Sequence, residues 1–207
     1  MCKNKFAVNL MVFFVKLTGV PMAWLYLKPR VKKLYKKRLP KNCIIVSNHK
    51  SLMDFVLYLV VFPFRTVRFL MAEVLFNKGP LFAKFLFLLG GIRVDRDAKD
   101  FSFVSDTIEV LDGGGTVGVF PEGRLPVNGK PFPFTVSTAY IALNSDAKIV
   151  PVYTDGNYGI NRRANVVIGE PFDINELKGD GLDQNAQLEH VTNQLHDIIY
   201  GLAENIK

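Results

Sequence analysis

The segment NHKSLMD, residues 48–54, carries two side chains that can act together on a proton. It follows the apolar run 43–47, which is typical of a short buried strand, and it precedes an apolar helical run. Residues that follow strand ends in α/β proteins lie near the ligand crevice. With His49 in the loop and Asp54 in the first helical turn, the carboxylate can return to the imidazole Nδ1. Nε2 is then left to accept a proton as a general base.

The same segment has a second interpretation. Ser51 and Asp54 have the spacing of a capping box at a helix N-terminus, and His49 would then be an ordinary loop residue. The other two histidines, His190 and His196, lie six positions apart in a predicted C-terminal helix. That spacing suits neither metal binding nor catalysis. The segment by itself leaves both interpretations open.

A second polar turn follows another predicted strand, in VFPEGRL, residues 119–125. Its proline and Gly123 form a tight turn that projects Glu122 and Arg124 from the carboxyl end of the strand. The planar guanidinium of an arginine offers paired donors that suit a phosphate group. The alternative is a plain surface turn with a solvated ion pair.

Two further segments carry weaker signals. GGIRVDRD, residues 90–97, places Arg93 and Arg96 near the far end of a strand. The triple glycine at 113–115 precedes a strand and lacks the Lys-Ser/Thr pair of a phosphate-binding P-loop, so it predicts a helix stop. No Gly-x-Ser-x-Gly motif of a serine hydrolase occurs.

Short strands and helices that alternate along the chain must position these side chains, and this alternation predicts an α/β fold. We expect a single domain with a central mixed, mostly parallel sheet flanked by helices. The expected strands are 43–47, 66–70, 92–95, 116–120, 148–153 and 165–171, and the expected helices are 52–62, 80–89, 98–112, 136–145 and 183–206.

An apolar stretch precedes this domain, at residues 6–27. As one helix it would measure roughly 33 Å, about the thickness of a bilayer core. However, Lys16, Gly19 and Pro21 interrupt it, and a charge and a helix breaker are costly inside a membrane. We therefore expect two short helices that dip into one leaflet. A signal peptide is the competing interpretation, but no small-x-small cleavage site follows.

Eight basic residues occupy the next segment, 28–41, and the whole chain of 207 residues carries a net charge of +7. Beside an apolar anchor, such a cluster is retained on the cytoplasmic side and is attracted to anionic lipid headgroups. Nucleic acid is not expected as a partner, because Tyr35 is the sole aromatic residue interleaved with the basic ones. We therefore divide the chain into membrane-anchoring helices, residues 1–41, and an α/β domain, residues 42–207.

Four blocks, taken in order, resemble the glycerophospholipid acyltransferase family, the group of the lysophosphatidic acid acyltransferases. The resemblance runs from about residue 43 to 171. The matching positions are His49 and Asp54 of the N-H-x4-D motif, Arg96 of the second block, Glu122, Gly123 and Arg124 of the third, and Pro151 in the strand of the fourth. One departure is that the family's third block reads F-P-E-G-T-R, whereas here Arg124 directly follows Gly123 and Leu125 occupies the usual arginine position.

The resemblance implies a transfer of a fatty acyl group from acyl-CoA or acyl carrier protein to the hydroxyl of lysophosphatidic acid. In this mechanism His49 is the base and Asp54 orients it, while the second and third blocks hold the acceptor's phosphate. No cofactor or metal is implied. Membrane phospholipids are expected partners, and the cytoplasmic face of the membrane is the expected location.

Several alternatives stay open beside this prediction. An enzyme of the same family that acts on another lysophospholipid or on glycerol 3-phosphate would carry the same motifs. An acyl-thioester hydrolase would use the same histidine and aspartate on water. A non-catalytic protein of lipid surfaces would need only the N-terminal apolar and basic segments.

Overall fold

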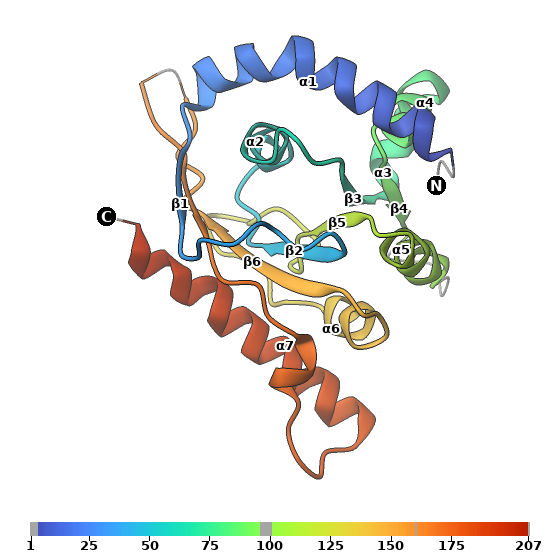
Figure 1. Ribbon diagram of the computed structural model, residues 1–207, viewed down its shortest axis with the longest axis vertical. Helices are drawn as coiled ribbons and strands as arrows, with labels where there is room; N and C mark the ends of the chain where they lie inside the picture. Colours follow the sequence, from blue (N-terminus) through green and yellow to red (C-terminus); the bar gives the residue numbers. More distant parts are fainter. Residues whose placement is uncertain (1–3, 96–100, 160, 207) are drawn as a thin grey trace.

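A seven-stranded mixed sheet forms the centre of the protein in the computed structural model, which describes residues 4–95, 101–159 and 161–206 (Figure 1). The strand order is β1-β7-β6-β2-β5-β3-β4. The strands are β1 (Arg30–Lys33), β2 (Cys43–Ser47), β3 (Val67–Ala72), β4 (Ile92–Val94), β5 (Thr116–Val119), β6 (Lys148–Thr154) and β7 (Asn165–Ile168). From β6 to β4 all neighbours are parallel, and β7 is antiparallel to β6.

Helices cover both faces of this sheet. They are α1 (Lys5–Leu27), α2 (Met53–Val61), α3 (Glu73–Phe76), α4 (Pro80–Leu88), α5 (Ser102–Asp112), α6 (Val136–Leu143) and α7 (Gln184–Gly201), with short 3-10 turns at Ile174–Leu177 and Leu202–Asn205. Figure 1 shows α1 and α2 above the sheet and α6 and α7 below it. The expected α/β class and the mostly parallel sheet are therefore confirmed.

The central strand β2 shows why the sheet needs two covering layers. All five of its residues are buried, and their side chains alternate between the two faces. Cys43 and Ile45 pack in the core beneath α2, whereas Ile44 and Val46 pack in the core that contains α6 and α7. Because the carboxyl ends of parallel strands lie at one edge, the loops after β2, β5 and β6 gather there.

The apolar N-terminal stretch forms one continuous helix, α1, so the expectation of two short helices is wrong. The Lys16 side chain donates to the carbonyl oxygens of Phe62, Pro63 and Arg65, just past the end of α2. These carbonyls belong to a helix terminus and the turn after it, which have acceptors to spare. Because its charge points into the protein, Lys16 requires no break in the helix. Pro21 is accommodated inside α1.

The basic segment after α1 is not helical, which corrects the expected helices of residues 1–41. Lys28 takes a left-handed conformation, and the following proline cannot continue the helix, so the chain turns into β1. The strand pairs in parallel with β7, with Val31 opposite Val166. All four β1 residues are exposed, and charged side chains on an edge strand disfavour pairing with another chain. Membrane contact of this segment stays a prediction.

Candidate active site

The chain leaves β2 through a residue that is fixed in the protein interior. Asn48 is fully buried. Its Nδ2 donates to the carbonyl of Thr154 at 2.9 Å, and its Oδ1 accepts from the Thr154 N–H at 2.8 Å. These two bonds tie the end of β2 to the end of β6. His49, the next residue, therefore begins its loop from a rigid point.

His49 and Asp54 lie in direct contact. His49 Nδ1 is 2.7 Å from Asp54 Oδ2, and the Asp54 carboxylate is fully buried. The same oxygen accepts from the backbone N–H groups of Lys50 at 2.7 Å and Ser51 at 2.9 Å. One carboxylate oxygen therefore shapes the loop and engages one ring nitrogen. With Nδ1 engaged, Nε2 is the nitrogen available to a substrate.

Bonds of the competing capping interpretation also occur, although the N-cap position of α2 is Leu52, one residue after Ser51. Ser51 Oγ accepts from the Met53 N–H at 3.2 Å, at the start of α2. The bond from the Ser51 N–H to the Asp54 carboxylate is the return bond of a capping box. The helix start and the His49 contact thus share one aspartate, and the two interpretations do not exclude each other.

Tyr158 completes this arrangement, although the sequence analysis did not identify it. Its hydroxyl donates to Asp54 Oδ1 from the loop that follows β6. Burial and the Asp54 charge raise the pKa of the Tyr158 hydroxyl, so it stays protonated and remains a donor. A sequence signal was available, because Tyr158 follows the end of a strand parallel to β2 by four positions.

An aromatic ring fixes the plane of the His49 imidazole. His49 stacks on Phe120, with ring centroids 4.2 Å apart and the planes inclined by 13°. Phe120 in turn stacks with Tyr58 of α2 and Phe69 of β3, which are both buried. Such a stack contributes about 0.5–1.5 kcal/mol for each pair beyond area burial. It leaves His49 with an edge toward the cavity and an apolar neighbour on one face.

Glu122 supports the His49 loop from the turn after β5. Only 3% of its surface is exposed, and its Oε1 accepts from the His49 backbone N–H at 3.0 Å and from the Tyr200 hydroxyl at 3.2 Å. Burial raises the pKa of the Glu122 carboxyl. Its Oε2 is buried without a hydrogen-bond partner among the described residues. The contacts observed are with the loop, and contact with a substrate stays a prediction.

The next two residues of this turn face a cavity instead. Gly123 has a φ of 64°, a left-handed conformation that favours glycine, and the turn thereby places Arg124 at the surface. The Arg124 guanidinium lies 5.8 Å from the centre of the Phe132 ring. Arg96, the other predicted phosphate ligand, falls outside the described residues. Arg93, close to it in sequence, pairs with Glu73 at 3.2 Å.

The cavity that His49 and Arg124 share has a volume of about 700 Å³. Its remaining walls are mainly apolar side chains of β3 and the helices around it: Leu52, Phe55, Phe69, Met71, Leu75, Phe82, Leu86, Phe101 and Phe103. The size is that of a site for an extended small molecule. A proton acceptor and a cation in a mainly apolar cavity suit a ligand with a polar head and a long hydrocarbon chain. Among the described residues, no three His, Cys, Asp or Glu side chains gather as a metal site requires.

Comparison with known proteins gives one family and one solved fold. A family model described as Acyltransferase matches residues 28–155. The chain is 33% identical over 116 residues to 1-acyl-sn-glycerol-3-phosphate acyltransferase beta of Homo sapiens, which covers 54% of this chain and 41% of that protein. It is 28% identical over 143 residues to 1-acyl-sn-glycerol-3-phosphate acyltransferase of Limnanthes douglasii, which covers 68% and 50%.

The crystal structure of the 1-acyl-sn-glycerophosphate (LPA) acyltransferase PlsC from Thermotoga maritima superposes with a TM-score of 0.64 at 25% identity. The match covers 99% of this chain and 83% of that one. By contrast, this chain spans half or less of the length of the two curated relatives above.

Proposed function

Since the chain belongs to the Acyltransferase family, we propose that it transfers a fatty acyl group from a thioester to the free hydroxyl of lysophosphatidic acid, which yields phosphatidic acid. The observation that carries this proposal is the His49–Asp54 contact beside a mainly apolar cavity that His49 lines. The names of the relatives and of the PlsC structure support the same acceptor.

In the proposed reaction the His49 Nε2 takes the proton of the acceptor hydroxyl. The hydroxyl oxygen forms a bond with the thioester carbonyl carbon, and the carbon–sulfur bond then breaks. The thiolate leaves and receives the proton from the imidazolium, so that His49 returns to its neutral form. Asp54 stabilises the imidazolium and holds the ring in the required tautomer. The carrier thiol belongs to coenzyme A or to acyl carrier protein.

The apolar cavity is the proposed site of a hydrocarbon chain. Phenylalanine and leucine side chains line it from α2, β3 and α4, and His49 lines it as well. Burial of a methylene group in such a cavity contributes about 0.8 kcal/mol. Positioning of the carbonyl and the hydroxyl beside one base supplies much of the rate enhancement in reactions of this type.

A panel of acceptors tests the proposal. The full-length chain in lipid micelles receives labelled acyl thioester with lysophosphatidate, glycerol 3-phosphate or lysophosphatidylethanolamine, and the products are separated. We expect phosphatidate as the main product. If transfer to one of the other two acceptors is faster, that acceptor is the substrate, and the chain is still an acyltransferase. Free fatty acid with every acceptor would identify a hydrolase.

We expect Arg124→Ala to raise KM for lysophosphatidate at least tenfold, with little change for the thioester. Arg124 lines the same cavity as His49, and a charge-assisted hydrogen bond contributes about 1.5–3 kcal/mol, roughly 10 to 150-fold in affinity. Arg124→Lys should restore part of the affinity, since a point charge cannot reproduce the guanidinium fork. Arg38→Ala, in the exposed basic segment, is the charge-matched control. If Arg124→Ala raises KM for the thioester by the same factor, Arg124 does not act specifically on the acceptor.

We expect Tyr158→Phe to lower kcat about tenfold with KM unchanged, because one hydrogen bond to the Asp54 carboxylate is lost while the ring stays in place. Tyr158 is a positioning residue, and the division between kcat and KM is the informative measurement. Tyr140→Phe on α6, which removes a hydroxyl from a more exposed tyrosine, is the control. A rise in KM without a fall in kcat would show that Tyr158 acts on binding instead.

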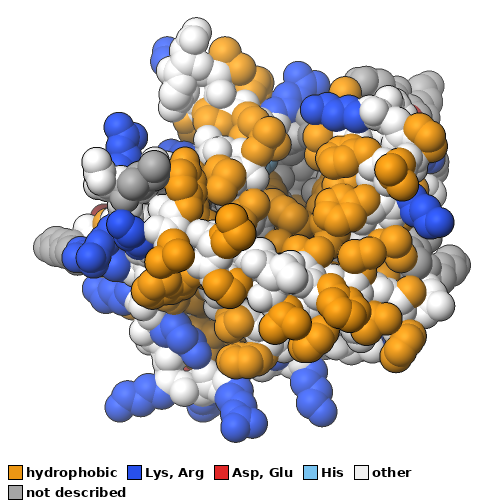
Figure 2. All heavy atoms as spheres, turned by 90° about the horizontal axis from the view of Figure 1, so that it is seen from above, with side chains coloured by type: hydrophobic (Ala, Val, Ile, Leu, Met, Phe, Trp, Pro, Cys, Tyr) orange, Lys and Arg blue, Asp and Glu red, His pale blue; other side chains and the backbone are white. Residues whose placement is uncertain are grey.

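The outer side of α1 is the proposed membrane-binding surface. The helix is long and apolar enough to cross a membrane, yet Val8, Val12 and Leu27 are buried against the body of the protein. Its exposed side carries large hydrophobic residues, and α4 adds more: Phe6, Leu10, Phe13, Phe14, Leu17, Met22, Trp24 and Leu25 from α1, and Leu81, Phe82 and Phe85 from α4. Figure 2 shows these hydrophobic side chains spread over one face, with Lys and Arg around it. This pattern is typical of a helix that lies in the membrane interface, and we propose the cytoplasmic face.

We expect the double variant Phe13→Glu with Leu17→Glu to bind vesicles at least tenfold more weakly. Both side chains are exposed on one side of α1, and burying each in lipid contributes about 1.5–3 kcal/mol. Co-sedimentation with vesicles measures the effect. Asn193→Asp with Gln194→Glu adds the same charge to the exposed side of α7 and should bind as the unaltered chain does. Undiminished binding by the α1 variant would contradict the proposed surface.

A further inference from the structure

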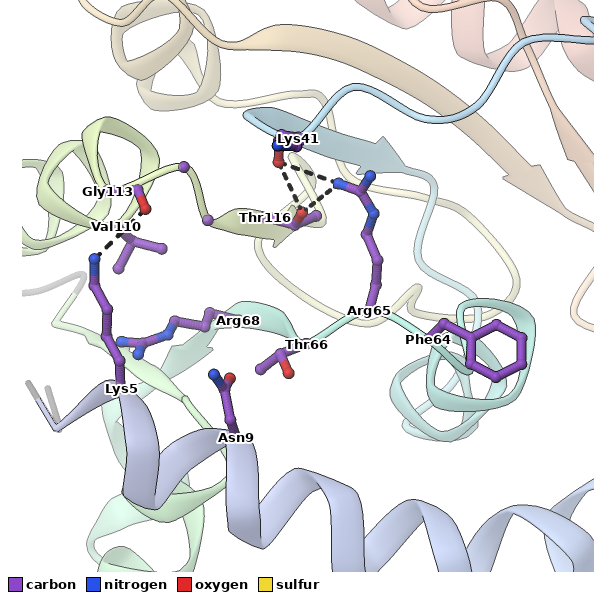
Figure 3. Close-up of a pocket in the computed structure, with 12 residues that line it drawn as sticks. Lys5, Asn9, Lys41, Phe64, Arg65, Thr66, Arg68, Val110, Gly113 and Thr116 are labelled. Carbon is purple, nitrogen blue, oxygen red and sulfur yellow. Dashed lines mark hydrogen bonds between the residues drawn. The ribbon is translucent and has the colours of Figure 1, made fainter.

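A second cavity, of about 410 Å³, lies at the opposite edge of the sheet from His49 (Figure 3). Thr66 precedes β3 and Thr116 begins β5, so this cavity is at the amino ends of the parallel strands. His49 follows the carboxyl end of β2. Lys5 and Asn9 of α1 line one side of the cavity, and the glycine turn 113–115 lines another. The cavity is therefore separate from the proposed active site.

Positive charge is concentrated around this cavity. Lys5, Lys41, Arg65 and Arg68 line it, and the described lining residues include no Asp or Glu. Arg68 is only 7% exposed. Figure 3 shows the side chains of Lys5 and Arg68 extending into the same space from α1 and β3. A cavity lined by side chains of one sign of charge attracts ligands of the opposite charge.

Hydrogen bonds to main-chain carbonyls and to the Thr116 hydroxyl hold one of these cations, Arg65, in place. Arg65 Nη2 donates to the Leu39 carbonyl and Nη1 donates to Thr116 Oγ1, both at 2.9 Å. Lys5 Nζ lies 3.5 Å from the Gly113 carbonyl, a long contact that leaves donors of the ammonium group for a ligand. A Cβ on Gly113 would come within 2.4 Å of Lys5 Nζ. A side chain at Gly113 would therefore displace the Lys5 ammonium group from its present position.

We propose that this cavity binds a phosphate group, either of a lipid headgroup or free in solution. The cations supply charge, and the Asn9 amide and the Thr66 hydroxyl supply neutral donors. Phe6 and Leu10, which neighbour Lys5 and Asn9 on α1, are exposed and apolar. A phosphate in the cavity and hydrocarbon along α1 would be the arrangement of an anionic lipid. The proposal does not depend on the activity of the chain.

The first measurement is a calorimetric titration of the full-length chain with inorganic phosphate, in a neutral detergent at low ionic strength. Asn9→Asp places a carboxylate in the cavity with almost no change of volume, and we expect it to weaken phosphate binding at least tenfold. Asn193→Asp makes the same change on the exposed side of α7 and should bind within twofold of the unaltered chain. We expect a second variant, Lys5→Gln, to weaken phosphate binding as well.

Vesicles of phosphatidylcholine, with and without phosphatidylglycerol, distinguish the two sources of phosphate. If the ligand is a headgroup, Asn9→Asp and Lys5→Gln show a weaker preference for phosphatidylglycerol than the unaltered chain, whereas Asn193→Asp keeps the full preference. If Asn9→Asp and Lys5→Gln weaken the binding of inorganic phosphate and leave vesicle binding unchanged, the ligand is free phosphate. The proposal is overturned if Asn9→Asp and Lys5→Gln match Asn193→Asp in both measurements.

Discussion

His49→Ala is expected to lower acyl transfer by a factor of 10² to 10⁴, the range in which a positioned general base contributes. The imidazole lines the mainly apolar cavity, with Nδ1 bound to Asp54 and one ring face on Phe120. Alanine removes the proton acceptor and leaves the backbone N–H that donates to Glu122. The rate of transfer from labelled thioester to lysophosphatidate measures the loss.

His190→Ala on α7 is the matched control, because it removes a histidine from an element on the far face of the sheet. Circular dichroism and vesicle binding of both variants should equal those of the unaltered chain. If the activity of His49→Ala stays within a few-fold of that of the unaltered chain, His49 is not the general base.

Asp54→Asn is expected to cause a loss of comparable size and to destabilise the fold as well. Four donors converge on this buried carboxylate: His49 Nδ1, the N–H groups of Lys50 and Ser51, and the Tyr158 hydroxyl. An amide presents a donor where one oxygen now accepts, so at least one bond is lost and the free energy of unfolding falls by about 1–3 kcal/mol. Transfer rate and thermal unfolding are both measured.

Asp183→Asn separates the two effects. Asp183 caps α7 through the Ala186 N–H, so this variant perturbs a helix cap far from His49. We expect a change of stability of no more than about 1 kcal/mol and full activity. If Asp54→Asn retained transfer while losing stability, Asp54 would be a structural residue and His49 would need no carboxylate partner.

The His49–Asp54 pair was predictable from sequence because its geometry is local. A short loop leads from His49 to Asp54 in the first turn of α2, and few conformations of so short a loop are possible. The Tyr158 and Tyr200 bonds were not predictable in this way, since they join residues 104 and 78 positions apart. The order of β2 and β6 in the sheet brings Tyr158 to Asp54, and the packing of α7 on the sheet brings Tyr200 to Glu122.

The N-terminal segment shows a second limit of prediction from sequence. A lysine inside an apolar stretch indicates a cost in lipid, but the cost disappears if the side chain points into the protein. Lys16 does so, toward carbonyls 46 to 49 positions away. The edge strand β1 was missed for a related reason, because Arg30–Lys33 is exposed and charged and has no apolar pattern. Its partner β7 is remote in sequence.

The most direct test of the proposed transfer is the release of thiol from acyl-CoA by the full-length chain, followed with and without lysophosphatidate. If His49 activates the acceptor hydroxyl, thiol release should rise at least about hundredfold when lysophosphatidate is added, and each thiol released should match one phosphatidate formed. Equal release without acceptor, with free fatty acid as the product, would contradict the account and show that His49 and Asp54 act on water.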